Sequence, residues 1–111
     1  TLDSLISKYG CPKFCKIDVE GYELQVLKGL HQPLPLISLE YCVPEMTNDL
    51  IECISYLQHL SPNGIFNYSI GESMEWASKQ WFNAESFKKL VNTQDFQNSL
   101  FGDIYFKNHY R

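Results

Sequence analysis

The stretch FCKIDVEGYELQVLKG, residues 14–29, decides the fold. Its first part, residues 14–19, is compact and rich in β-branched and aromatic side chains, a composition typical of a buried strand. Gly21 then allows a sharp turn. The apolar side chains that follow recur four residues apart, at Tyr22, Val26 and Leu30, and predict a helix that Gly29 ends. A strand followed directly by a helix is therefore expected here.

The same strand-helix unit occurs again immediately downstream. Residues 36–41 (LISLEY) are predicted as a second buried strand, and Thr47, Asn48 or Asp49 can cap the helix after it. The apolar residues of that helix share one face: Leu50, Cys53, Ile54, Leu57 and Leu60. Because parallel neighbours need a long crossover, two such units in a row predict adjacent parallel strands. A short amphipathic helix, residues 2–9, precedes both units behind a capping Thr1.

The last third of the chain has a different pattern. Apolar and polar residues alternate over residues 66–70, which predicts a strand with one polar face, and Asn83 can cap a short helix. Residues 104–106 predict a final strand. We expect an α/β fold with a sheet of about four strands, mostly parallel, with helices on the faces. The closing strand should lie antiparallel between residues 36–41 and residues 66–70.

Composition limits the classes of function. A chain of 111 residues that is 44% hydrophobic can build one modest core. The net charge of -4, with no basic run longer than Lys88 and Lys89, argues against nucleic acid as a partner. No apolar stretch approaches the ~20 residues that span a bilayer, so no membrane role is expected. The four cysteines have no zinc-ligand spacing, which predicts no metal site and a reducing, cytoplasmic location.

Acidic residues stand where the first predicted strand ends. In an open parallel sheet, ligands bind in the crevice beyond the carboxyl ends of the strands, and Asp18 and Glu20 fall at that point. Gly21 lets the backbone approach a ligand closely. The alternative is structural, because Glu20 and Glu23 would also stabilise the following helix as ordinary first-turn acids. Spacing alone leaves both interpretations open.

Other candidate residues also carry two interpretations. Glu40 lies near the end of the second strand, where either Lys16 on the neighbouring strand pairs with it or it faces the site. Aromatic residues in the last third either line an acceptor pocket or belong to the core: Trp76, Trp81 and Phe82. The histidines are expected to face solvent or cap helices and not to act in catalysis: His31, His59 and His109.

Three stretches carry a family resemblance: TLDSLI (residues 1–6), residues 14–29 and LISLEY (residues 36–41). In this order and spacing they resemble the second half of the FkbM-like methyltransferases, over residues 1 to about 61 and only weakly afterwards. The resemblance implies a class I methyltransferase that uses S-adenosylmethionine and has a Rossmann-like sheet. It also implies methyl transfer to a hydroxyl of a small molecule or sugar. Residues 1–111 would then be the C-terminal portion of a single domain.

The resemblance also implies site residues. Asp18 matches the fourth-strand acid of the family and Glu20 its neighbour. Together with the positions argued above, this assigns cofactor contact to Asp18 and Gly21 and catalysis to Asp18, Glu20 and Glu40. The family's glycine-rich loop and ribose-binding acid would lie upstream of Thr1, and no Gly-x-Gly turn occurs in these 111 residues. The isolated chain is therefore expected neither to bind S-adenosylmethionine usefully nor to turn over.

A non-catalytic function is the alternative. A half-domain derived from a methyltransferase exposes a sheet edge, which can pair with a partner or with a copy of itself. Association into a homo-oligomer through that edge is the partnership this alternative predicts.

Overall fold

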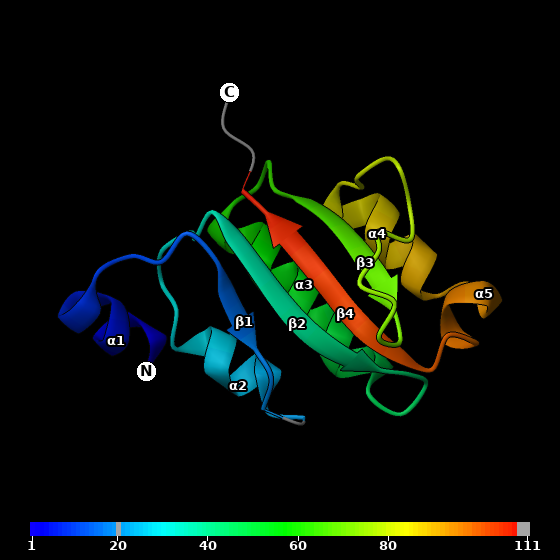
Figure 1. Cartoon of the computed structure of the whole chain (residues 1–111), viewed down its shortest axis with the longest axis horizontal. Helices are drawn as coiled ribbons and strands as arrows, with labels where there is room; N and C mark the ends of the chain where they lie inside the picture. The colour runs from blue at the N-terminus through cyan, green and yellow to red at the C-terminus, as the bar shows by residue number, and fades with distance from the viewer. Residues whose placement is uncertain (20, 109–111) are drawn as a thin grey trace.

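The computed structural model describes residues 1–19 and 21–108, so Glu20 and His109 lie outside the described residues. The elements follow in the order α1 (Leu2–Tyr9), β1 (Cys15–Ile17), α2 (Glu23–Lys28), β2 (Leu36–Cys42), α3 (Thr47–Leu60), β3 (Ile65–Ile70), α4 (Ala84–Val91), α5 (Gln94–Gln97) and β4 (Phe101–Lys107) (Figure 1). Both strand-helix units and the closing strand predicted from the sequence are present. The α/β class is confirmed.

The four strands form one sheet in the order β1-β2-β4-β3. β1 and β2 are parallel, as predicted, and β4 runs antiparallel between β2 and β3, also as predicted. The expectation of a mostly parallel sheet is wrong. The inserted β4 is antiparallel to both of its neighbours, so two of the three strand pairs are antiparallel.

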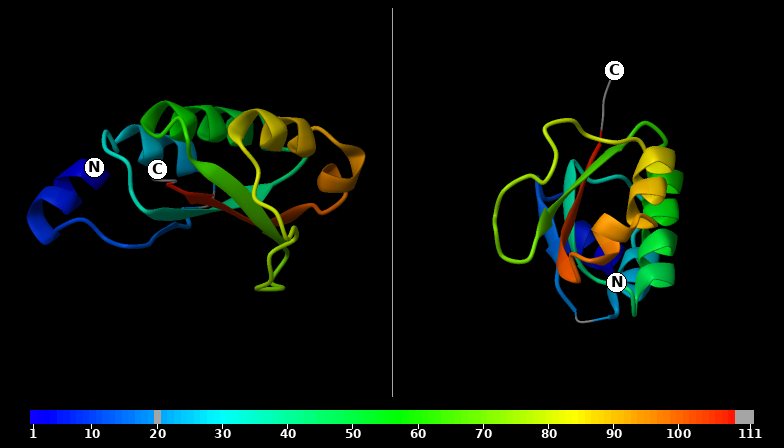
Figure 2. Two further views of the ribbon diagram at one scale, coloured as in Figure 1. Left: turned by 90° about the horizontal axis from the view of Figure 1, so that it is seen from above. Right: turned by 90° about the vertical axis from the view of Figure 1, so that its right-hand side faces the viewer.

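The helices α2, α3 and α4 pack on one face of the sheet, and the opposite face carries no helix among the described residues (Figure 2). The expectation of helices on the faces therefore holds for one face only. Buried side chains fill the space between the helices and this face, including Leu27, Ile54, Leu57, Phe66, Phe87 and Phe106. We call the other side of the sheet the open face; the segment of residues 71–82 overhangs part of it.

Local sequence explains most helix ends. Thr1 accepts a hydrogen bond from the Ser4 amide and Asn83 accepts one from the Ser86 amide, so the predicted caps of α1 and α4 are confirmed. The predicted cap of α3 is wrong. Met46 precedes that helix without a side-chain cap, because the Thr47 hydroxyl donates to the Pro44 carbonyl instead.

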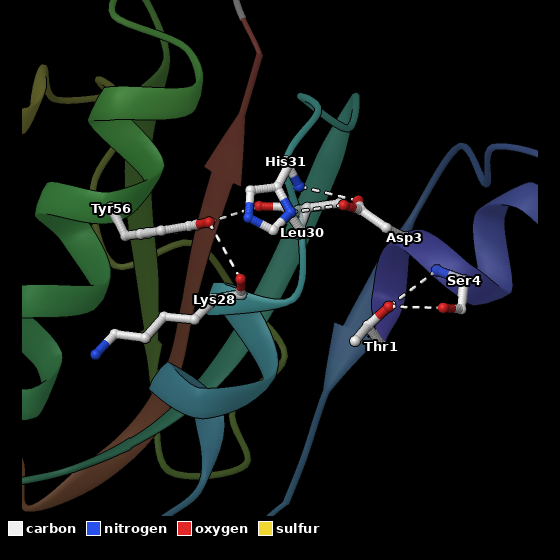
Figure 3. A network of polar contacts seen from close by, with 7 residues as sticks. All are labelled: Thr1, Asp3, Ser4, Lys28, Leu30, His31 and Tyr56. Atoms are coloured by element: carbon white, nitrogen blue, oxygen red, sulfur yellow. Dashed lines mark hydrogen bonds and ion pairs between the residues drawn. The ribbon is translucent and has the colours of Figure 1, made fainter.

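α1 lies beyond β1, to one side of the sheet, and a small polar network attaches it (Figure 3). The His31 backbone amide donates to Asp3 Oδ1 at 2.9 Å, and His31 Nδ1 lies 2.6 Å from Asp3 Oδ2. Next to it, the Tyr56 hydroxyl donates to the Leu30 carbonyl at 2.7 Å, which ties α3 to the segment carrying His31. No residue of α1 is fully buried, but Leu2 and Ile6 are partly buried and pack against the core, so both polar contacts and packing hold this helix in place.

The two edges of the sheet differ. Along β3, residue Phe82 forms a bridge with Phe66, and the Ala77 amide donates to the Tyr68 carbonyl at 2.7 Å. The segment of residues 71–82 therefore covers that edge. β1 forms the other edge and, among the described residues, pairs on one side only.

Across the described ranges, no helix combines the length and the apolar character needed to cross a bilayer.

Candidate active site

Polar residues form a row across the open face. In the antiparallel pairing Glu40 lies opposite Asp103, and Asp103 lies opposite Ser69. Ile17 of β1 pairs with Leu39 of β2. Asp18 follows Ile17 directly and Glu40 follows Leu39 directly, so the two acids come immediately after the same pair of residues. Since alternate side chains of a strand point to opposite faces, the buried Leu39 faces the helices and Glu40 faces away from them.

Asp18 and Glu40 act as a pair. Interaction with the Asp18 side chain is the largest cause that raises the pKa of Glu40 to about 7; desolvation and the nearby negative charges of Asp18, Asp103 and Glu23 add to this effect. Glu40 is itself exposed, so the contact with Asp18 matters more than burial. Glu40 therefore holds its proton at a pH at which an isolated carboxyl is ionised.

Lys16 interacts with a different acid. Burial raises the pKa of Asp103, and the positive charge of Lys16 opposes this shift. Within the described residues no ion pair joins Lys16 to Glu40. The structure therefore does not contain the ion pair between Lys16 and Glu40 that was one of the two alternatives for Glu40.

These residues line a hollow of about 450 Å³, which we call the open-face hollow. Its charged lining residues are Lys16, Asp18, Glu40, Glu72 and Asp103. Met74 and Phe101 add exposed apolar surface at its rim. Carboxylates accept hydrogen bonds and can take up a proton, so the hollow suits a ligand that carries hydroxyl groups.

Glu23 holds the turn between β1 and α2. Its carboxylate accepts hydrogen bonds from the Gly21 amide at 3.0 Å and from the Val19 amide at 3.2 Å. Glu23 is buried, and Gly21 has a φ of 95°, a value that favours glycine. Glu23 thus has a structural role, because it fixes the backbone next to Asp18. This agrees with the structural interpretation of Glu23 given from the sequence.

A second hollow, of about 350 Å³, lies between α2, α3 and the end of β2. We call it the helix hollow. Its apolar lining comes from Leu24, Leu39, Tyr41, Met46, Leu50 and Cys53. Glu40 lines both hollows, and Gly21 lines the helix hollow only.

The remaining candidates lie elsewhere. Trp76 is 52% exposed, and it packs edge-on against Tyr105 and Trp81 at 4.6 and 5.0 Å between ring centroids. The core assignment is therefore wrong for Trp76, and neither hollow includes Trp81. Phe82 is half-buried and packs on the core. Neither His31 nor His59 lines a hollow.

The four cysteines are free thiols, and burial raises the pKa of the Cys53 thiol to about 12. Such a thiol stays protonated and inert. In the described part of the chain, no three His, Cys, Asp or Glu side chains are grouped to hold a metal ion.

Sequence reasoning missed Asp103 as a candidate. Its only signal was its place at the start of the closing strand, after Gly102. That signal becomes informative only when the antiparallel register sets Asp103 beside Glu40. Glu20, the remaining candidate, lies outside the described residues.

The fold places the protein among the α/β domains with acidic residues at the carboxyl ends of parallel strands, the edge at which open sheets of this kind have their ligand crevice. The comparison with known families refines this assignment. The sequence matches the family model of the methyltransferase FkbM domain over residues 1–61, which cover α1 to α3. The chain belongs to the FkbM methyltransferase family. No curated protein and no solved structure gives a significant match.

Proposed function

We propose that the protein acts in methyl transfer from S-adenosylmethionine to a hydroxyl oxygen of a small molecule or sugar. The observation that carries this proposal is the juxtaposition of Asp18 and Glu40, which follow the last paired residues of two parallel strands and line the same hollow. The family membership supplies the reaction class. The open-face hollow supplies carboxylates that can bind hydroxyl groups.

The reaction needs a proton acceptor next to the attacking oxygen. A lone pair of the acceptor hydroxyl forms the new C–O bond, the C–S bond breaks, and its electron pair stays on sulfur. The hydroxyl proton passes to a carboxylate, for which the Asp18 and Glu40 pair is the candidate. A carboxyl with a pKa of about 7 suits this step, because a base works best when its pKa is near the working pH.

The described residues fit one wall of a site for S-adenosylmethionine, whose role is to supply an activated methyl group. The acids near Asp18 complement the positive charge of a sulfonium. At Gly21 a Cβ would meet no atom nearer than 3.9 Å, so the backbone is accessible. These 111 residues contain no Gly-x-Gly turn, so we propose that they form the C-terminal portion of one domain and that a glycine-rich turn from outside them completes the site.

The test compares two substitutions in the complete methyltransferase domain. Asp18→Asn should lower turnover by about 100-fold or more, the usual contribution of a general base. His59→Ala, on the late part of α3 and outside both hollows, should change turnover by less than about twofold. Equal, small effects of both substitutions would remove Asp18 from the mechanism.

A second candidate function rests on the open edge at β1. An unpaired strand can add a strand from a partner or from a copy of the chain, which would make this an interaction module. Sedimentation of the chain distinguishes the two: an obligate dimer without methyl transfer would favour the module.

A further inference from the structure

We propose that the helix hollow binds the apolar part of the methyl acceptor, and that this acceptor is neutral or positively charged. The inference rests on the proposed function, because it assigns to the hollow the same acceptor whose hydroxyl would react beside Glu40. It extends that proposal by naming the chemical class of the acceptor.

The size of the hollow is the first argument. Its volume of about 350 Å³ falls at the lower end of the range of roughly 300 to 1,000 Å³ found for small-molecule sites. A single aromatic ring or a short aliphatic group fits this space. The lining that would contact it is apolar and comes from three elements, with Leu24 on α2, Leu39 on β2 and Leu50 on α3.

Position is the second argument. Glu40 lines both hollows, and it lies where β2 runs on to Cys42 beyond its last pairing with β1, so the two hollows flank this part of β2 where β1 no longer covers it. A molecule with its apolar part between α2 and α3 can therefore present a hydroxyl to the carboxyl pair. Binding energy from the distant apolar part would then orient the reacting oxygen.

Charge is the third argument. The acids that line the helix hollow are Glu23, Glu40 and Asp49, and none of the described lining residues is Lys, Arg or His. The Glu23 carboxylate is already bonded to two backbone amides, whereas Asp49 is exposed at the start of α3. An anionic ligand would meet only like charges, so carboxylated and phosphorylated acceptors are disfavoured.

The test uses three probes that share a phenol ring and differ in charge: tyrosol, tyramine and 4-hydroxyphenylacetate. Each is titrated into the 111-residue chain while amide and methyl NMR shifts are followed. Probes of about ten non-hydrogen atoms bind at about millimolar concentrations. Tyrosol and tyramine should give saturable shifts at Leu24, Met46 and Leu50, and 4-hydroxyphenylacetate should bind at least about tenfold more weakly at low salt.

Two variants with a matched control sharpen the result. Met46→Trp should fill the hollow and weaken tyrosol binding about tenfold, whereas Ile51→Trp, on the same helix but outside the hollow, should not. Asp49→Lys changes an exposed residue, so the fold should persist even if the tryptophan variant misfolds. Asp49→Lys should reduce the ratio of the affinity for tyramine to the affinity for 4-hydroxyphenylacetate. Glu52→Lys, at an exposed position outside the hollow, should reduce this ratio less.

The inference is overturned if the three probes bind equally, if their shifts map to the open-face hollow alone, or if none binds below about 20 mM. Failure of the inference and failure of the proposed function are separable. Methyl transfer by the complete domain without probe binding here would leave the proposed function standing. Probe binding with no methyl transfer would leave the hollow a binding site and remove the reaction.

Discussion

Asp103 on β4 lies directly opposite Glu40 on β2, so two carboxyl side chains occupy facing positions on the open face. Like charges directly opposite each other destabilise a sheet when both are ionised. The arrangement is tolerated because the raised pKa of Glu40 keeps this carboxyl protonated to a higher pH and because Lys16 offsets the charge of Asp103. A local electrostatic cost at the end of two parallel strands is typical of a functional site.

The first prediction concerns the cause of the raised pKa of Glu40. Asp18→Ala removes the side chain whose interaction with Glu40 is the largest cause of the raised pKa, so the pKa of Glu40 should fall from about 7 toward its ordinary value of 4.5. A carbon-detected NMR titration of the side-chain carboxyl measures this directly. Asp95→Ala, on α5, removes a charge that is not among the causes of the Glu40 shift, so it serves as the control and should leave the titration unchanged. A Glu40 pKa that stays near 7 without Asp18 would assign the shift to desolvation instead.

The second prediction concerns stability and pH. The folded pKa of Glu40 lies above its unfolded value, so the folded chain binds the extra proton and stability falls as pH rises from 4.5 to about 7. Glu40→Gln should therefore stabilise the fold at pH 8 and have little effect at pH 4. Because Glu40 is exposed, screening limits the gain to about 1 kcal/mol, or about 4 °C in Tm.

Thermal unfolding at the two pH values checks this prediction. Glu52→Gln, at an exposed position of α3, is the control and should give the same difference from the parent chain at both pH values. A Glu40→Gln chain that is less stable than the parent at pH 8 would contradict the sign of the shift.

The third prediction concerns the close packing of β4. A Cβ at Gly102 would collide with the backbone carbonyl of Ser69 and lie 2.9 Å from the Tyr41 ring. Backbone cannot yield as a flexible side chain does, so Gly102→Ala should destabilise the fold by about 3 kcal/mol. At Gly71 the φ of 56° strains an alanine, but the nearest atom is 3.7 Å away. Gly71→Ala should therefore cost only about 1 kcal/mol. Urea unfolding of both variants measures the difference, and equal losses would show that steric collision does not set the cost.

The fourth prediction concerns the methyl donor. The 111-residue chain contains the strand-end acids but no Gly-x-Gly turn, so it should bind S-adenosylmethionine no more tightly than about millimolar. A micromolar ligand corresponds to about 8 kcal/mol, and losing half of that gives this value. Titration calorimetry is the measurement. A saturable micromolar heat would show that these residues suffice or that a second copy completes the site, and sedimentation of the same sample would separate those outcomes.

Local pattern predicted the elements whose environment is simple. The buried stripe of α3 follows from apolar spacing, since Leu50, Cys53, Ile54 and Leu57 all face the core. The run of residues 14–19 predicted a strand, although the paired part is shorter, Cys15–Ile17. α5 was not predicted, because Gln94–Gln97 has one buried side chain, Phe96, and too little apolar periodicity to signal a helix.

What the sequence could not predict depends on contacts distant along the chain. The role of Asp103 requires the register of β4 against β2, which pairs Asp103 with Glu40, 63 positions earlier in the chain. The exposure of Trp76 reflects a segment held by the buried Asn67, whose amide donates to the Ser78 carbonyl at 2.9 Å. Periodicity carries no information on either contact. The sequence identified Glu40 as a candidate but not its partner. Lys16 lies on the neighbouring strand and Asp18 just after it, so the sequence alone could not decide which of them contacts Glu40.

The covering of β3 by residues 71–82 limits how the sheet can grow. With that side occupied, only β1 has unpaired backbone groups along an edge in the described part of the chain. A sheet with a single free edge can be extended once, by a strand of a partner or of a second copy related by a two-fold axis. If the β1 strands of two copies pair, the described residues offer no further free sheet edge, so this mode of pairing stops at two chains.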